Sequence, residues 1–572
     1  MPTSADLTNH GVARHDVVIL GGGLAGLSLA LQLKQRDPSI DVCVIERHQH
    51  PVREAAFKIG ESTVEIGAWY FAEVLGLREH MEQEQIKKFG FRFFFSDGLS
   101  GIDRCTELGA SGVLPVPAWQ LDRGRFENML AQRARDAGVH LHAGARVRSF
   151  DLVDGDADAD VDVDVDVDID ADASTQQLHT VHYENAAGRH TLESRWLVDA
   201  SGRAGLVKRK LGLARSNDHN ANAVWFRVDG RIDPHDWSDD PAWLGRVDPP
   251  ERWRSTNHLC GPGYWVWLIP LASGAHSVGI VCDAAAHPLD GMNTFDKALA
   301  WLQRHQPRLA QALAGIEPMD FAFFRDFSYS CTHVFSANRW ALTGEAGLFL
   351  DPFYSPGSDF IAISNTYIAD LIAMDRAGQP FAAHAGVYEQ LYFSFYESTL
   401  SMYQGQYDLF GDPRLMSLKV MWDYTYYWGV LGPLFCGGRI ADLTVMARLK
   451  TELARAKALN FAMQQFLRAW HEASPGKAEL APRLLDQSRI PWFAELNRAL
   501  EDQLDTRAFL QRIRQNIVRL EVLAREMREQ AHCQIDLPEG LALDGLLAEP
   551  SPAPTDAGRL LDDAWYARAV AG

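Results

Sequence analysis

The chain has 572 residues and a formal net charge of −20, half of which comes from ten aspartates between Asp154 and Asp172. The remaining charge is ordinary for a soluble enzyme. No basic tract of the kind that binds nucleic acid is present, so we exclude nucleic acid as a partner. No run of 18 apolar residues occurs, so we expect no membrane span.

The cysteines indicate the redox environment. Seven are scattered along the chain without a C-x-x-C pair or a metal-binding spacing. This usage is typical of a reduced intracellular protein, and it predicts neither a disulfide framework nor a metal site. The first 16 residues contain no apolar segment of a secretion signal. We therefore expect a cytoplasmic protein.

The first long motif spans residues 17–46. A β-branched run ends in GGGLAG at residues 21–26, which fits G-x-G-x-x-G, and a helix-forming segment and a second apolar run follow. Glycines allow a tight turn and a close approach to a pyrophosphate, whose charge is favoured at a helix N-terminus. Glu46 closes the second run, where an acid can accept hydrogen bonds from ribose. The pattern predicts a dinucleotide site.

Shorter elements follow the motif. Residues 60–63 read as a loop before an N-capped helix, residues 86–95 as one strand, and residues 140–150 as another. An acidic Asp/Val insertion then covers residues 153–174. A strand with one charged face and a calcium site are conceivable for it, but we favour an inert insertion because like charges repel.

Residues 195–203 predict a strand that returns beside the glycine loop. An antiparallel substrate sheet is expected at about 215–335, and residues 340–347 predict a strand with a second glycine turn before a long helix. From about residue 379 the composition is helical. The aromatic segment Val420–Phe435 either lines an apolar pocket or is plain core. We predict an α/β protein with a nucleotide-binding module at 1–380 and a helical domain at 381–572.

Three pieces of the sequence together resemble the FAD-dependent aromatic hydroxylase superfamily, namely GGGLAG with its acid, VDASGR at 198–203 and TGEAGLFLDP at 343–352. Within that superfamily, WVWLIP at 265–270 resembles the W-x-W-x-I-P signature of flavin-dependent halogenases. KFGFRF at 88–93 looks like the lysine-bearing strand of that family. The resemblance covers about residues 15–380.

The resemblance implies an activity. FAD, reduced by a separate NAD(P)H flavin reductase, would use O2 to convert chloride or bromide to hypohalous acid, which passes to Lys88 and then to an electron-rich aromatic carbon. Lys87 and Lys58 are alternatives for the lysine. Trp265, Trp267, Pro270 and Ser355 would flank the tunnel on the flavin side, and the amides of Gly357 and Ser358 would bind halide.

The resemblance also implies the residues that bind FAD. Asp199 could serve either the flavin or its own loop, and Glu345 stands where aspartate is usual. The implied cofactor-binding set is Gly21, Gly23, Leu24, Ala25, Gly26, Glu46, Arg47, Arg123, Gly344, Glu345, Gly357 and Ser358.

Two departures from the family pattern bear on the substrate. Tyr354 stands where tryptophan-type halogenases carry a glutamate, which favours a phenol or pyrrole, free or tethered to a carrier protein, over free tryptophan. Pro356 replaces a residue with an N–H and removes one donor for halide. The leading hypothesis is a halogenase of secondary metabolism. An FAD monooxygenase or reductase without halide chemistry, and a non-catalytic flavoprotein, are the alternatives.

Overall fold

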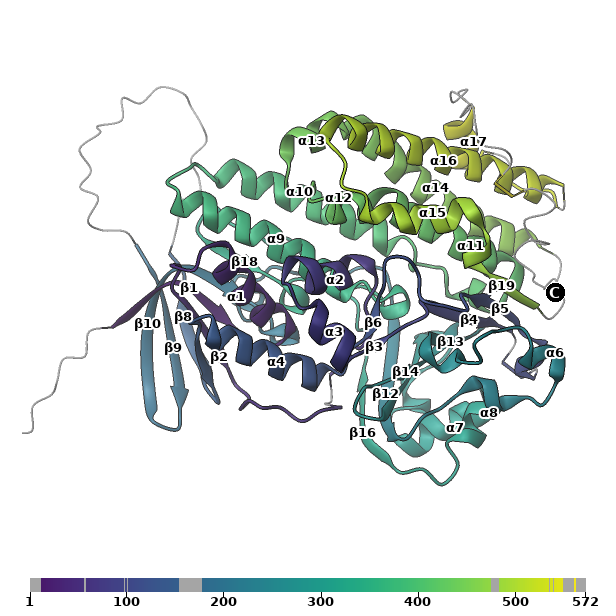
Figure 1. Ribbon diagram of the computed structural model, residues 1–572, viewed down its shortest axis with the longest axis horizontal. Coiled ribbons are helices and arrows are strands. Elements are labelled where there is room, and N and C mark those ends of the chain that lie inside the picture. Colours follow the sequence, from purple (N-terminus) through teal and green to yellow (C-terminus); the bar gives the residue numbers. More distant parts are fainter. Residues whose placement is uncertain are drawn as a thin grey trace, which may run out of the picture.

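The computed structural model describes residues 12–55, 58–96, 98–99, 101–153, 177–474, 483–533, 535–538, 540–548 and 560–561. The acidic insertion falls almost entirely outside these residues. Two large sheets, two two-stranded sheets and a layer of helices make up the described fold (Figure 1).

The first sheet holds the dinucleotide motif. Its strand order is β7-β2-β1-β10-β9-β8, and β18 also pairs with β10. β1, β2, β7, β10 and β18 run parallel, so their carboxyl ends meet at one edge. These strands are β1 (Ala13–Leu20), β2 (Val42–Glu46), β7 (His140–Ala143), β8 (Arg146–Asp151), β9 (His179–Asn185), β10 (Gly188–Asp199) and β18 (Trp340–Leu342).

The predicted return of the chain beside the glycine loop is confirmed. β10 pairs with β1 so that Asp199 lies opposite Leu20, and the amide of Ala200 donates to the carbonyl of Leu20. The apolar run at the end of β1 is fully buried, as expected for a parallel strand covered on both faces. The glycine turn and the end of β10 therefore share one edge of the sheet.

The second sheet has the order β16-β12-β15-β14-β13-β4-β5-β19. Most of its pairs are antiparallel, as predicted, but β13 with β4 and β5 with β19 are parallel. Its strands are β4 (Phe91–Phe95), β5 (Thr106–Gly109), β12 (Ala221–Asp229), β13 (Thr256–Gly261), β14 (Tyr264–Pro270), β15 (Ala275–Asp283), β16 (Pro318–Phe324) and β19 (Arg483–Asp486). The sheet thus extends beyond 215–335, and the C-terminal region is not purely helical because it supplies β19.

The two faces of this second sheet belong to different cores. Along β14, Trp265 and Trp267 join the main core, whereas Val266 and Leu268 join a smaller one, as the two-residue period of a strand requires. The smaller core packs under α7 (Phe295–His305) and α8 (Pro307–Ala312). The main core is continuous with the first sheet and the C-terminal helices. The inner face of the sheet therefore looks toward the cofactor motif.

Helices cover the rest of the molecule. The C-terminal helices, green to yellow in Figure 1, form a layer above both sheets. In the described part of the chain, every helix is too short or too polar to cross a bilayer. The other helices are α1 (Leu24–Arg36), α2 (Glu65–Trp69), α3 (Arg78–Glu84), α4 (Arg123–Asp136), α5 (Leu206–Lys210), α6 (Pro241–Leu244), α9 (Gly357–Arg376), α10 (Ala382–Leu400), α11 (Pro413–Tyr426), α12 (Gly432–Cys436), α13 (Leu443–Arg448), α14 (Lys450–Ala473), α15 (Pro491–Arg498), α16 (Thr506–His532) and α17 (Ala542–Leu547).

Two predicted strands are each divided in the structure. Residues 86–95 form β3 (Ile86–Lys87), which pairs with β6 (Trp119–Gln120), and then β4 in another sheet. The backbone at Gly90 has a φ of +74°, which a strand does not allow and glycine does. Residues 140–150 divide between β7 and β8, because Gly144 has a φ of +69°. Lys88 consequently lies on a loop rather than on a strand.

The predicted N-cap of the helix after residue 63 is wrong. The helix begins at Glu65, and its N-cap residue, Val64, has no side chain that can accept a hydrogen bond. Thr63 instead exchanges hydrogen bonds with the backbone of Trp119, and the hydroxyl of Ser62 lies 3.0 Å from that of Thr256. The polar loop is therefore hydrogen-bonded to β6 and to β13 of the second sheet.

Candidate active site

A large cavity of about 740 Å³ opens at the carboxyl ends of the parallel strands. This is the edge at which α/β proteins bind nucleotides. Two of the predicted site residues, Gly26 and Pro270, lie outside its lining: Gly26 packs under the glycine loop, and Pro270 pairs with His276 at the end of β14. The other predicted residues except Lys88 line it, namely Gly21, Gly23, Leu24, Ala25, Glu46, Arg47, Arg123, Trp265, Trp267, Gly344, Glu345, Ser355, Gly357 and Ser358.

The glycine loop has the shape that a pyrophosphate requires. Gly21 has a φ of +114°, and a Cβ on Gly26 would lie 2.0 Å from the carbonyl oxygen of Gly21, so side chains are excluded at both positions. A Cβ on Gly23 would meet no atom within 4 Å, and this residue precedes α1 without a side-chain cap. The N-terminus of α1 is thus open to an anion in the cavity.

Charged side chains complete this end of the cavity. Glu46 accepts hydrogen bonds from the amides of Gly22 (2.6 Å) and His48 (2.8 Å), which fix its carboxylate beside the loop. Arg123 contacts the carbonyl of Ile59 and the carboxylate of Glu127, yet its buried Nε has no hydrogen-bond partner among the described residues. An orphaned guanidinium N–H, a glycine cradle and an acid at a strand end together fit an adenine dinucleotide.

Asp199 serves the loop rather than the cavity. Its carboxylate accepts hydrogen bonds from the amide of Ser201 (2.9 Å) and from the amide of Val207 in α5 (2.7 Å). Both oxygens are therefore used within the chain, and Asp199 is absent from the cavity lining. Of the two roles left open by the sequence, the structure favours the one in the residue's own loop.

A second helix N-terminus faces the cavity. α9 begins at Gly357 with Pro356 as its N-cap residue and no side-chain cap, and the buried hydroxyl of Ser358 has no partner. The donors left free by a helix belong to its first residues, whereas the N-cap precedes them. Proline at 356 therefore removes none of the amides of Gly357 and Ser358. Ser355, which precedes Pro356, has a φ of +50°, and residues other than glycine and asparagine rarely adopt this backbone conformation.

Trp265 and Trp267 form the wall of the cavity on the side of the second sheet. Both are buried, and their rings lie 5.8 Å apart. The indole of Trp265 donates to the hydroxyl of Tyr407, and that of Trp267 to the hydroxyl of Ser277. Since both N–H groups are satisfied, the two rings present only apolar surface to the cavity.

Lys88 lies behind this wall and is 2% exposed. Its Nζ donates to the hydroxyls of Ser62 (2.9 Å) and Thr256 (3.3 Å) and sits 4.0 Å from the centre of the Phe91 ring. Burial lowers the pKa of Lys88 to about 7, against the raising effect of the carboxylates of Glu65 and Asp359. A buried amine that can gain or lose a proton near neutral pH is suited to chemistry.

The two alternative lysines lack these properties. The side chain of Lys87 is 32% exposed and pairs with Glu82, and that of Lys58 is 34% exposed and pairs with Glu127. Lys88 has no such ion pair within the described chain. Of the three, only Lys88 combines burial with an uncommitted charge.

A second, smaller cavity of about 40 Å³ lies on the other side of Lys88, and we call it the tyrosine pocket. Ser62 and Thr256, the partners of Lys88, line the large cavity, whereas Phe91 lines the tyrosine pocket. Lys88 thus stands between the two. The tyrosine pocket is lined by Val64, Phe91, Tyr354, Pro356, Asp359, Phe360, Thr399, Met402, Tyr403, Asp423, Tyr424, Tyr426, Tyr427 and Leu431.

The aromatic segment Val420–Phe435 belongs partly to the core and partly to a pocket, the two alternatives that the sequence left open. Trp422 and Trp428 are buried in the main core, whereas Tyr424 and Tyr427 line the tyrosine pocket. One turn of π-helix, Tyr427–Leu431, interrupts the α-helical hydrogen bonds between α11 and α12. Such turns occur frequently at functional sites.

Comparisons with known proteins agree with this geometry. Residues 14–252 match the family described as an FAD binding domain. A curated relative, the flavin-dependent halogenase chlA of Dictyostelium discoideum, is 27% identical over 76% of this chain and 72% of its own length. A 1H-pyrrole-2-carbonyl-[peptidyl-carrier protein] chlorinase of Pseudomonas fluorescens is 25% identical over 62% of this chain and 74% of its own.

Solved structures agree as well. The flavin-dependent brominase Bmp2 is 25% identical, with a TM-score of 0.53 over 69% of this chain and 87% of its own. The halogenase PltM in complex with FAD gives a TM-score of 0.62 over 93% of this chain and 99% of its own, and at 16% identity it shows the fold alone. The chain is similar to flavin-dependent halogenases, and the comparisons support that activity for it. Its cofactor is FAD, and the comparisons do not support a monooxygenase without halide chemistry.

Several residues of the site could not be predicted from the sequence of this chain. Ser62 and Thr256 hold Lys88, yet they lie far apart in the chain and carry no motif. His258 is buried against Trp265, 4.7 Å away between ring centres, with its Nδ1 unpartnered. Burial and the charge of Lys88 hold its pKa well below the ordinary value, so it is neutral. Asp359 follows the predicted halide residues directly, which is the one local signal.

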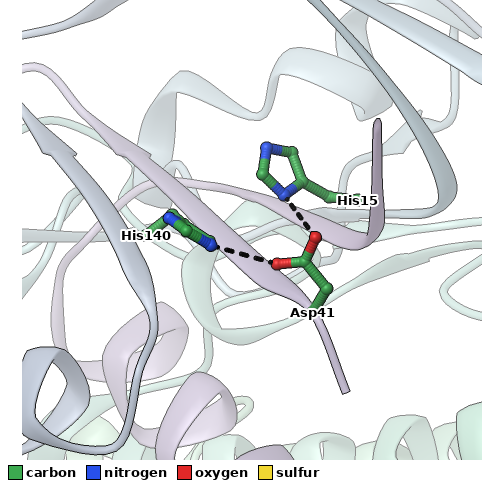
Figure 2. Close-up of side chains that lie close together, drawn as sticks. All are labelled: His15, Asp41 and His140. Atoms are coloured by element: carbon green, nitrogen blue, oxygen red, sulfur yellow. Dashed lines mark hydrogen bonds and ion pairs between the residues drawn. The ribbon is translucent and has the colours of Figure 1, made fainter. Parts of the chain in front are cut away.

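A polar cluster occupies the opposite edge of the first sheet (Figure 2). Asp41 lies 3.0 Å from the Nδ1 of His15 and 3.3 Å from the Nε2 of His140, at the amino ends of β1, β2 and β7. These three residues could hold a metal ion by their spacing. The contacts of the carboxylate with the two rings already account for the cluster, so we assign no metal to it.

Proposed function

We propose that Lys88 carries an electrophilic halogen from the large cavity to an activated aromatic ring held in the tyrosine pocket. The observation that supports this most directly is the position of Lys88, buried between the two cavities, with hydroxyl partners on one side and an aromatic ring on the other. A group in that position controls what passes from one cavity to the other.

The residues of the large cavity would hold the cofactor and the halide. Bound there, reduced FAD with O2 converts chloride or bromide to hypohalous acid. The glycine loop, Glu46 and Arg123 would bind the dinucleotide, and the amides of Gly357 and Ser358 would hold the halide at the positive end of α9. Trp265 and Trp267 keep the ring of the substrate away from the flavin side.

Lys88 would bind hypohalous acid and polarise it. As an ammonium it donates a hydrogen bond to the oxygen of the acid, and as an amine it can take the halogen on nitrogen. A pKa of about 7 makes both forms accessible at neutral pH. Ser62 and Thr256 fix the direction of the Nζ, so that the halogen faces the ring in the tyrosine pocket.

The substrate would be a phenol or a pyrrole rather than free tryptophan. Within the described chain, no lysine, arginine or histidine lines the tyrosine pocket, so a carboxylate on the substrate would find no cationic partner there. The tyrosine rings suit a flat and largely apolar ring. Relatives act on a pyrrole tethered to a carrier protein, and we propose a small free ring for this chain, around which the tyrosine pocket of about 40 Å³ would have to widen. A separate NAD(P)H flavin reductase would supply the reduced FAD.

The test uses Lys88→Met together with the wild type. Each is supplied with FAD, a flavin reductase, NADH, O2 and bromide. Phenol, resorcinol, pyrrole and tryptophan are tested as substrates, and the products are identified by mass spectrometry. Monochlorodimedone in a parallel reaction traps free hypobromous acid. We expect wild type to brominate resorcinol or pyrrole, and Lys88→Met to lose at least 100-fold of that rate while hypobromous acid still reaches the trap.

Lys87→Met is the matched control, because Lys87 is the neighbour in sequence but is exposed and paired with Glu82. It should brominate at the wild-type rate. Ring bromination by Lys88→Met at a wild-type rate would show that the lysine is not the carrier. Oxidation of NADH by the purified protein without the reductase would contradict the two-component scheme.

A further inference from the structure

We propose that Asp359 is the catalytic base that accepts the proton which the ring loses when it takes up the halogen. This inference rests on the proposed function and deepens it. Electrophilic substitution leaves a proton on the attacked carbon, and a positioned carboxylate removes it fastest. Tyr354 stands where tryptophan-type relatives carry a glutamate, so another carboxylate must face the ring.

Two buried carboxylates line the tyrosine pocket, and one of them is already committed. Asp423 accepts hydrogen bonds from Lys419 (2.8 Å), from the hydroxyl of Tyr354 (2.8 Å) and from the amide of Gln464 (2.7 Å). It therefore has an ion-pair partner of its own and donors on both oxygens. Burial raises the pKa of the Asp423 carboxyl, but the charge of Lys419 and the three donors oppose this effect, and Lys419 already neutralises the carboxylate.

Asp359 has a different set of partners. It is 2% exposed, and it accepts hydrogen bonds from the amide of Gly67 (2.8 Å) and the hydroxyl of Tyr427 (2.8 Å), both of which are neutral donors. Among the described residues it forms no ion pair, and the cation whose charge it senses is that of Lys88. The group that delivers the halogen and the carboxylate therefore serve the same pocket.

The step balances when both groups act. The ring carbon bonds the halogen of hypohalous acid, the O–X bond breaks, and the departing hydroxide takes a proton from the Lys88 ammonium to form water. The C–H bond then breaks, its electron pair restores the aromatic ring, and its proton goes to Asp359. Transfer of that proton to the Lys88 amine restores both groups. The sum is ring C–H and HOX to ring C–X and water, with no further oxidant.

The proton affinities of the two groups suit this return. Burial raises the pKa of Asp359 to about 8, and burial lowers that of Lys88 to about 7. One pKa unit corresponds to about 1.4 kcal/mol, so transfer between them is nearly balanced. The titratable groups that face Asp359 are Glu65 on α2, Lys88, Tyr403, Tyr427 and Cys436.

The first test is Asp359→Asn, which keeps the shape and one acceptor oxygen. Resorcinol and its ring-deuterated form are brominated by the full chain with its reductase, and monochlorodimedone traps hypobromous acid in parallel. We expect a loss of about 10²–10⁴ in the rate of ring bromination, the range for general base catalysis, with more oxidised bromide reaching the trap. We also expect a deuterium isotope effect in the variant that wild type lacks, because loss of the ring proton becomes rate-limiting.

A purely structural role for Asp359 would give other results. A slower variant without an isotope effect would reduce Asp359 to a positioning residue, and an unchanged rate would overturn the proposal outright. Asp359→Glu should restore part of the rate. Wild type that brominates neither resorcinol nor the trap would instead refute the proposed function itself, so the two failures are distinguishable.

Tyr427→Phe provides a second test that does not depend on folding of Asp359→Asn. The Tyr427 hydroxyl stabilises the Asp359 carboxylate, and its loss should raise the pKa of that group further. The acidic limb of the rate of ring bromination should therefore move to higher pH in the variant. An unmoved limb would show that Asp359 does not titrate in the reaction.

Discussion

The large cavity and the tyrosine pocket lie on either side of Lys88 but are built in different ways. Loops at the ends of parallel strands form the large cavity, with backbone amides and glycines as its main features. Side chains from α9, α10, α11 and the π-helical turn form much of the tyrosine pocket, and half of its lining residues are aromatic. The first is a backbone site and the second a side-chain site.

This difference separates what the two cavities can vary. Backbone amides at a helix N-terminus suit any phosphate or halide. The loop before α1 tolerates few changes, because a Cβ on Gly21 or Gly26 would collide with the neighbouring backbone. A pocket of side chains can be reshaped by single substitutions, so it is the side on which ring specificity can change. Variants on each side should therefore affect different measurements.

The largest effect is expected at the buried ion pair behind the tyrosine pocket. Lys419 and Asp423 are both buried, 2.8 Å apart. Lys419→Met would leave the Asp423 carboxylate without its cation, and breaking such a pair costs about 3–5 kcal/mol. The free energy of unfolding from urea titration should fall by that amount, whereas the affinity for FAD, measured by flavin fluorescence, should stay at the wild-type value.

Lys419→Met with Asp423→Leu serves as the control. Replacing both partners by apolar groups of similar volume is often neutral, so the double variant should recover most of the lost stability. A double variant as unstable as Lys419→Met alone would show that packing rather than charge decides. A change in FAD affinity in either variant would contradict the separation of the two cavities.

At the boundary of the cavities, the stability should depend on pH through Lys88 and Asp359. The pKa of Asp359 rises from 3.8 to about 8 on folding, and that of Lys88 falls from 10.5 to about 7. From about pH 4 to 7 the folded chain holds more protons than the unfolded one, so the stability contributed by the pair falls as pH rises, by up to about 1.4 kcal/mol per pH unit. Between 7 and 8 it is level, and above 8 it rises.

The measurement compares wild type with the double variant Lys88→Met and Asp359→Asn by urea titration from pH 5 to 10. The free energy of unfolding of wild type, minus that of the double variant, should be lowest between pH 7 and 8. A difference that is flat across this range would mean that the two groups keep ordinary pKa values in the folded chain.

On the flavin side, Gly26→Ala and Gly23→Ala should differ. A Cβ at 26 would lie 2.0 Å from the carbonyl oxygen of Gly21, so the loop must shift, at a cost of about 1–3 kcal/mol of stability and with weaker FAD binding. A Cβ at 23 meets no protein atom within 4 Å, so stability should hold while FAD binding weakens. Equal stability of both variants would contradict the observed packing.

The residues of the large cavity could be predicted from the sequence more fully than the surroundings of Lys88 and of the tyrosine pocket. The glycine loop, Glu46 and the second turn at Gly344 are contiguous motifs, and each lies where its motif places it. Lys88 is identified by the resemblance, but its setting is not, because Ser62 and Thr256 are brought to it by tertiary pairing between distant segments. Asp423 reaches Tyr354 from another helix, and no local pattern encodes that contact.

The smallest effect is expected at Ser355, beside Pro356, which lines both cavities. The left-handed backbone of Ser355, with a φ of +50°, costs a non-glycine residue about 1–2 kcal/mol of stability. Glycine avoids this strain, but the larger conformational entropy that it loses on folding cancels part of the gain. Ser355→Gly should therefore raise the free energy of unfolding by less than about 1 kcal/mol, whereas Ser355→Ala, which keeps the strain, should not. If both variants lost stability equally, the hydroxyl rather than the backbone would decide. If only the glycine variant were stabilised and ring bromination slowed in it, the strained turn would be shown to position the start of α9, whose first residues line both cavities.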